Sequence, residues 1–207
     1  MFEQAMNLLL SGEFICPIRY PDAYRYLSDE AHQKDVTAYL ARIGRKLSVT
    51  GLGGGWYMSF DQIGQDQRRA VRDEFSRIKL DLRFLVEFFV KAMRASEREE
   101  FYSRGDKIEA HALMAAIDSN PGLRAEFQAL ATVGRGSGSD GKLKSNLDRQ
   151  LKYLRDEGYL VLANPEREIY QVTGKIEYLY EVVQFLMGID GIADDVDEEG
   201  PTTPQMF

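Results

Sequence analysis

The clearest periodic pattern in the chain lies at residues 142–157, where leucines recur at steps of four, four and three. This spacing puts the leucines on one face of an α-helix. They are Leu143, Leu147, Leu151 and Leu154. Gly158 is expected to end the helix, and two runs of strand-forming residues then flank a tight turn at Pro165. A helix followed by such a hairpin is the C-terminal half of a winged-helix domain.

The same order of elements is predicted earlier in the chain. Residues 28–43 carry apolar positions at helical spacing, with Ser28 as the expected N-cap and Gly44 at the expected left-handed C-terminal position. The runs KLSVT and WYMSF follow, separated by a glycine-rich turn, and they predict a second hairpin. The sequence therefore predicts a mainly α fold with small β-hairpins, arranged as tandem winged-helix domains.

One long helix, at residues 66–95, is predicted to join the two domains. Its apolar residues step by four and three alternately, which is a heptad-like seam. They are Val71, Phe75, Ile78, Leu82, Leu85, Phe89 and Ala92. From Leu80 onward most positions are apolar, and a helix that is apolar on most faces is buried on most faces. We expect this second half in the core of the second domain. The seam is either part of a rigid connector or a surface for a dimer or another partner.

The predicted organisation has four parts. The first winged-helix domain spans residues 1–65, the connecting helix 66–95, and the second winged-helix domain 96–189. In the second domain Asp106 and Glu109 resemble a capping box and predict a helix over residues 107–118. Residues 190–207 are acidic with little apolar content, so we expect a disordered acidic tail there.

Charge and cysteine content fit a protein of the reducing cytoplasm. The net charge of −7 comes largely from the acidic residues between Asp190 and Glu199, so the body is close to neutral. The single cysteine, Cys16, excludes an intramolecular disulfide framework. No apolar run approaches the roughly 20 residues that span a bilayer. We expect a cytoplasmic protein that does not enter membranes.

Three sequence features could indicate a nucleotide, dinucleotide or metal site, but none of them forms a complete motif. Residues 136–142 resemble the phosphate-binding loop, but Leu143 stands where a serine or threonine should bind magnesium. The glycines at 53–55 fit a hairpin turn better than a dinucleotide site. His32 and His111 are the only histidines, so no zinc-type cluster is available. We expect no catalytic residues, no metal and no cofactor, and therefore no enzyme.

The one binding signal with a physical mechanism is a basic face on the helix at residues 142–157 and the loop before it. Such a face can meet nucleic-acid phosphates. The candidate DNA-binding residues are Arg135, Lys142, Lys144, Arg149, Lys152 and Arg155. Asp148, Asp156 and Glu157 dilute the face, so a solvated surface or an acidic protein partner are the alternatives. Arg68, Arg69 and Arg72 at the start of the long helix leave the same alternatives open.

The chain resembles the MukE/MksE family of bacterial condensin subunits, which are tandem winged-helix proteins of the kleisin-interacting (KITE) type. The residues that carry the resemblance are the loop, basic helix, glycine and wing at residues 134–162, and the first-domain segments at 14–47 and 47–60. The segments of the first domain resemble the short, MksE-type members in particular. In all, the resemblance covers about residues 5–187.

This resemblance implies a non-catalytic, nucleoid-associated subunit. It implies a homodimer that binds a MukF/MksF-like kleisin, which bridges the heads of a MukB/MksB-like, SMC-like ATPase. The complex would engage DNA without sequence specificity, for chromosome organisation and segregation or, in a related branch, for plasmid defence. No single partner-contact residue carries over from the family. The alternative is a dimeric winged-helix transcription regulator that reads bases with Asn146, Arg149 and Gln150.

Overall fold

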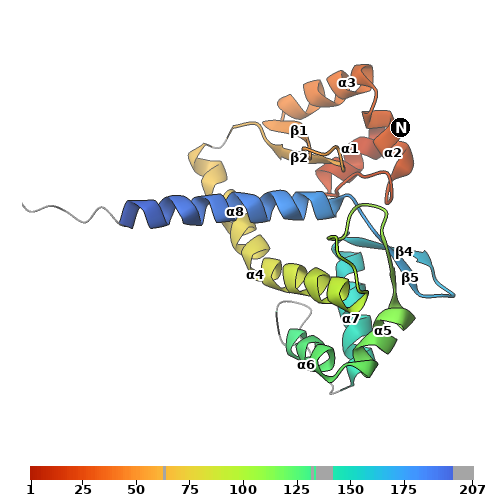
Figure 1. Cartoon of the computed structure of the whole chain (residues 1–207). Helices are drawn as coiled ribbons and strands as arrows, with labels where there is room; N and C mark the ends of the chain where they lie inside the picture. The colour runs from red at the N-terminus through yellow and green to blue at the C-terminus, as the bar shows by residue number, and fades with distance from the viewer. Residues whose placement is uncertain (63, 132, 134–141, 198–207) are drawn as a thin grey trace, which may run out of the picture.

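The computed structural model describes residues 1–62, 64–131, 133 and 142–197, and these residues form eight helices and five strands (Figure 1). The predicted fold class, mainly α with small antiparallel hairpins, is confirmed. The buried side chains fall into two separate hydrophobic clusters, one before the long helix and one from that helix onward. We call the two parts built around these clusters the N-terminal unit and the C-terminal unit.

The N-terminal unit packs three helices against a hairpin. Its elements are α1 (Phe2–Leu10), α2 (Pro21–Leu27), α3 (Glu30–Ala41), β1 (Arg45–Val49) and β2 (Trp56–Phe60). The strands are antiparallel, with Arg45 opposite Phe60 and Val49 opposite Trp56. Ile15 bridges to Trp56, so the extended segment before α2 lies along the hairpin. The order of helices and hairpin agrees with the predicted winged-helix arrangement, which stays a prediction.

The N-cap of α3 is Asp29, so the prediction of Ser28 is wrong. The Asp29 carboxylate accepts hydrogen bonds from the backbone amides of Ala31 and His32, at 2.8 and 3.4 Å, and these bonds lower its pKa. Ser28 instead closes the preceding helix, because its hydroxyl donates to the carbonyl of Tyr24. Serine and aspartate both favour N-cap positions, so the identity of the N-cap of α3 depended on where α2 ended.

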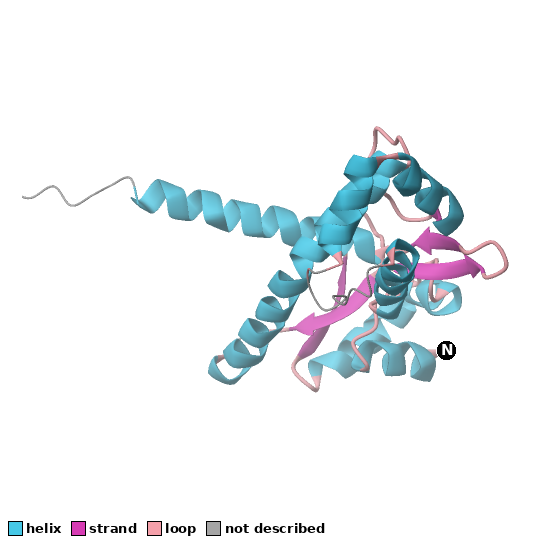
Figure 2. Ribbon diagram, turned by 90° about the horizontal axis from the view of Figure 1, so that it is seen from below, coloured by secondary structure: helices cyan, strands magenta, loops and turns pink. Residues whose placement is uncertain are grey.

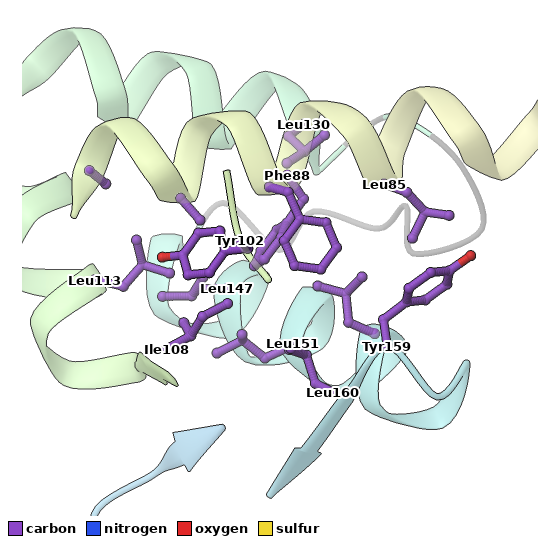
Figure 3. Close-up of a cluster of buried hydrophobic side chains, with 14 of the residues drawn as sticks. Leu85, Phe88, Tyr102, Ile108, Leu113, Leu130, Leu147, Leu151, Tyr159 and Leu160 are labelled. Carbon is purple, nitrogen blue, oxygen red and sulfur yellow. The ribbon is translucent and has the colours of Figure 1, made fainter. Parts of the chain in front are cut away.

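The long helix is α4 (Gln65–Ala95), and its second half lies in the core of the C-terminal unit, as predicted. Phe84, Leu85, Phe88 and Phe89 are each at most 3% exposed. Phe88 meets Phe127 edge-on, with ring centroids 6.2 Å apart, in the cluster that Figure 3 shows. The side chains of Val71 and Phe75, at the start of the predicted seam, lie outside the described residues.

The C-terminal unit completes this core with four further helices and a three-stranded sheet. Its other elements are β3 (Lys107–Glu109), α5 (Ala110–Ser119), α6 (Pro121–Leu130), α7 (Leu143–Asp156), β4 (Leu160–Asn164), β5 (Ile169–Val172) and α8 (Lys175–Asp197). The strand order is β3–β5–β4, and both pairings are antiparallel.

The strand β3 stands where the sequence predicted the first turn of a helix at residues 107–118. Ile108 is buried between two exposed neighbours and lies opposite Tyr170 of β5, which is the alternation of a strand. Asp106 does not form the predicted capping box. Its carboxylate accepts hydrogen bonds from the Arg98 guanidinium and the Ser103 amide instead. Pairing with the open edge of β5 outweighed the local helical signal.

The predicted helix end at Gly158 is confirmed, and the predicted start of the disordered tail is wrong. Asn120 caps α6 by accepting from the amides of Gly122 and Leu123, and Thr173 accepts from the Lys175 amide at the start of α8. Gly158 has a φ of +83°, as a residue that ends a helix requires. However, α8 continues to Asp197, whereas a disordered tail was predicted from residue 190. Helical hydrogen bonds are local, so a helix anchored in a core continues into an acidic segment. Residues 198–207 lie outside the described part.

Replacing Leu85 by Asp should lower the free energy of unfolding by about 4 kcal/mol or more, because it removes a buried side chain and buries a charge. Urea unfolding followed by circular dichroism measures the change. The matched control is Lys79→Asp on an exposed position of the same helix. Equal unfolding midpoints for the two variants would show that this part of α4 is not core.

Raising the pH from about 10 to 12 should destabilise the fold partly through Tyr180. Its hydroxyl donates to the carbonyl of Tyr102 at 2.8 Å, and burial, with the charge of Asp106, raises the pKa of Tyr180 to about 12. Its contribution to stability is complete below pH 10, where the unfolded phenol is also protonated, and is lost as the pH rises through the folded pKa. Urea titrations should therefore show a smaller alkaline loss for Tyr180→Phe than for wild type. Exposed Tyr39→Phe should keep the wild-type slope.

Candidate nucleic-acid interface

Helix α7 has one face buried in the core and the opposite face exposed to solvent. Its buried residues are Asn146, Leu147, Gln150, Leu151 and Leu154. The leucines belong to the cluster that α4 enters, so the helix cannot turn without opening the core. Two candidates of the sequence analysis, Lys144 and Lys152, are consequently exposed on the opposite side, and Lys142 is exposed at the N-cap.

The remaining candidates contribute less. Arg149 and Arg155 are partly buried, and the Arg155 guanidinium is paired with the Asp156 carboxylate at 2.9 Å. A side chain that already holds an ion pair has less charge to offer a phosphate. Arg135 lies outside the described residues. The structure therefore places five of the six predicted residues on or beside one helix, with the three lysines the most accessible.

Acidic neighbours limit the basic face on the side of the hairpin. Asp148 lies close enough to Lys144, Glu168 and His111 for each charge to act on it, while partial burial is the main reason that its pKa is raised. His111 is itself paired with Glu168, with 3.2 Å between nitrogen and oxygen. These acidic groups thus offset part of the positive charge of Lys144 on the side of the hairpin.

The hairpin β4–β5 does not extend the basic face. Its turn presents Glu166 and Arg167 to solvent, and Glu168 is half-buried at its end. The turn is fixed locally, because the Asn164 side chain accepts a hydrogen bond from the Arg167 amide at 3.0 Å. A turn with this mixed charge offers little attraction for a phosphate backbone.

Two of the three side chains proposed for base reading, Asn146 and Gln150, point inward. Asn146 is 2% exposed and Gln150 is 1% exposed, so neither can reach a base edge in a groove without unfolding the helix from its core. Neither polar atom of Gln150 has a hydrogen-bond partner among the described residues. Of the three, only Arg149 is partly exposed, so the set of side chains that favoured a sequence-reading transcription regulator is reduced to one.

The motifs considered for other chemistry gain no support. The glycine loop at residues 136–141 lies outside the described residues. His32 stacks on Tyr26 with ring centroids 3.9 Å apart. Within residues 1–62, 64–131, 133 and 142–197 no group of histidine, cysteine and acidic side chains is arranged to hold a metal ion. No helix in the same part of the chain is long and apolar enough to cross a membrane.

Sequence reasoning missed the contact between the two units. The turn between β1 and β2 lies against the first turns of α8, where the Thr50 hydroxyl donates to the Glu177 carboxylate at 3.1 Å. The Gly51 amide donates to Glu181 at 2.6 Å. Arg104, in the loop before β3, donates to the carbonyl of Gly53 at 3.0 Å. No local signal reports this contact, because its partners are more than fifty residues apart in the chain.

Two glycines make the approach possible. A β-carbon on Gly174 would overlap the carbonyl of Gly54, and a β-carbon on Gly54 would overlap the Glu177 carboxylate. The glycines at 53–55 lie in the turn between β1 and β2, as predicted. Of these glycines only Gly53 has a positive φ, at +70°. Gly54 serves the contact between the units rather than the shape of the turn.

Comparison with known protein families gives one match, to the family described as condensin complex protein MksE, over residues 1–183. No curated protein matches the sequence. The family match covers both units up to the first nine residues of α8, and it confirms the resemblance to the MukE/MksE family.

Proposed function

The chain belongs to the MksE family of condensin complex proteins, and from that premise we propose that it is a non-catalytic condensin subunit that binds a kleisin and engages DNA. In this proposal it forms a homodimer, and the kleisin connects it to an SMC-like ATPase. The assembly acts at the nucleoid, in chromosome organisation and segregation or in defence against plasmids.

Exposed apolar side chains support the proposed protein partners. On the N-terminal unit Phe2 and Tyr39 meet edge-on, at 6.0 Å between ring centroids, and Tyr39 is 44% exposed. On α8, Phe185 and Met187 are more than half exposed on a helix that extends away from the body of the molecule (Figures 1 and 2). Apolar groups exposed in this way are typical of surfaces that become buried in an assembly.

The observation that carries the DNA proposal is the open face of α7. Lys142, Lys144 and Lys152 are exposed on a helix whose other face is fixed in the core. A lysine side chain contacts a phosphate as a flexible point charge, and such a contact does not distinguish one base from another. Since Asn146 and Gln150 are buried, we propose binding through the backbone, without sequence specificity and with strong dependence on salt.

Replacing Lys142, Lys144 and Lys152 together by Glu should weaken DNA binding. The slope of log affinity against log salt should become shallower by up to about 2.7, because each lost phosphate contact removes about 0.9. Fluorescence anisotropy on a duplex of random sequence, at several salt concentrations, measures both quantities. Copurification of the kleisin should persist, because the buried face of α7 is unchanged.

The matched control makes the same change of charge elsewhere. Lys46, Lys79 and Lys107 are exposed and lie off α7, so their triple replacement by Glu should reduce DNA affinity only through net charge. Equal losses of affinity and slope in the two triple variants would contradict the assignment of DNA contact to α7. A preference of the wild-type chain for one sequence would contradict backbone binding.

A further inference from the structure

The contact between the two units combines hydrogen bonds with ring contacts of Phe14 and Tyr57 to Tyr178. The two hydrophobic clusters share no residue, so no continuous core fixes one unit to the other. α4 provides the covalent link, and a single helix leaves the relative angle of two such units free. The contacts of the β1–β2 turn with α8 and Arg104 therefore decide that angle.

Glu177 joins groups from both units. Its carboxylate accepts the hydrogen bond of Thr50 from the N-terminal unit and lies 3.8 Å from the Arg104 guanidinium of the C-terminal unit. Its side chain is only 10% exposed, although it carries a charge. A carboxylate so little exposed needs these partners, since burying an unpaired charge is costly. Separating the units leaves it without the Thr50 hydroxyl.

The conformation of the β1–β2 turn positions its polar groups for hydrogen bonds with Glu177 and Arg104. The Thr50 side chain that donates to Glu177 also accepts from the Gly54 amide at 2.7 Å, so one hydroxyl closes the turn and holds α8. Arg104 reaches the carbonyl of Gly53 from the other side. Beside the turn, the rings of Tyr57 and Tyr178 meet at 5.2 Å and add an apolar contact between the units. In contrast, Leu52 of the same turn is 80% exposed.

We propose that the β1–β2 turn is a releasable clip, in which Glu177 is the positioning residue and Gly54 and Gly174 allow the two backbones to approach closely. When closed, the clip fixes the orientation of α3 relative to α7 and the direction in which α8 leaves the body. When open, the units swing about α4 while both cores stay folded. A partner that contacts both units therefore biases the clip through its preference for one orientation.

Gly174→Ala is the most selective way to open the clip. The added methyl group overlaps the Gly54 carbonyl across the contact, whereas the φ of Gly174 is not positive, so alanine fits the local backbone. Gly188→Ala is the matched control, because it makes the same change within α8, the helix that Gly174 immediately precedes, and meets nothing within 4 Å. Glu177→Ala removes the positioning carboxylate, and Leu52→Ala is its control in the turn.

The experiment measures the distance between spin labels on the two units of the full chain. Thr37→Cys on α3 and Gln128→Cys on α6 are exposed sites, and Cys16, which lies beside Gly174 at the contact, is replaced by Ser in every variant so that it takes no label. Wild type and both controls should give one narrow distribution by pulsed electron resonance. Gly174→Ala and Glu177→Ala should give a broadened or shifted distribution with an unchanged helix signal in circular dichroism.

Hydrogen exchange gives a second readout at the clip itself. The Gly51 amide, held by Glu181, should exchange about tenfold faster or more when the clip opens, while amides in both cores keep their protection. Wild-type distances and exchange in both clip variants would overturn the proposal. Should Gly174→Ala fail to fold, Glu177→Ala decides alone: it opens the clip or the proposal fails.

Discussion

Burial of the second half of α4 is the constraint on which the C-terminal unit depends. Phe84, Leu85, Phe88 and Phe89 fill the centre of a cluster to which α5, α6, α7 and α8 all contribute. Because this half of the helix is enclosed on most sides, the other helices can be amphipathic and still find an apolar partner. The leucine face of α7 is one consequence, and the exposure of its lysines is another, since a helix held by one face must present the other.

Each of the two units also buries its apolar side chains in a cluster of its own. What joins the units beyond α4 is a turn with two close glycines, a shared carboxylate, a few hydrogen bonds and the rings of Phe14, Tyr57 and Tyr178. Such a contact specifies one orientation of the two units, but it holds them less strongly than a shared hydrophobic core would. A subunit that has to fit between several partners benefits from this combination, because its surfaces are defined while its internal angle can still respond.

Periodicity and caps predicted most of the fold, because these signals are local. The leucine stripe of α7 and the helix end at Gly158 each depend on residues within a few positions. The errors arose where distant residues decided the outcome. Lys107–Glu109 became a strand because β5 offered an open edge, and Gln150 turned inward with the leucines although its polarity suggested a role in binding. Of the candidate site, the basic residues could be predicted from their spacing, but the ion pair of Arg155 and the Glu177 junction could not.

The central claim, a condensin subunit that works by holding partners, is tested most directly by recovering the complex from cells. The untagged chain, expressed at its native level, would be captured with a specific antibody and its partners identified and quantified by mass spectrometry. Recovery of a kleisin and a large coiled-coil ATPase in fixed ratio to the chain is the predicted result. Recovery of the chain alone, together with tight binding to one DNA sequence, would contradict the account.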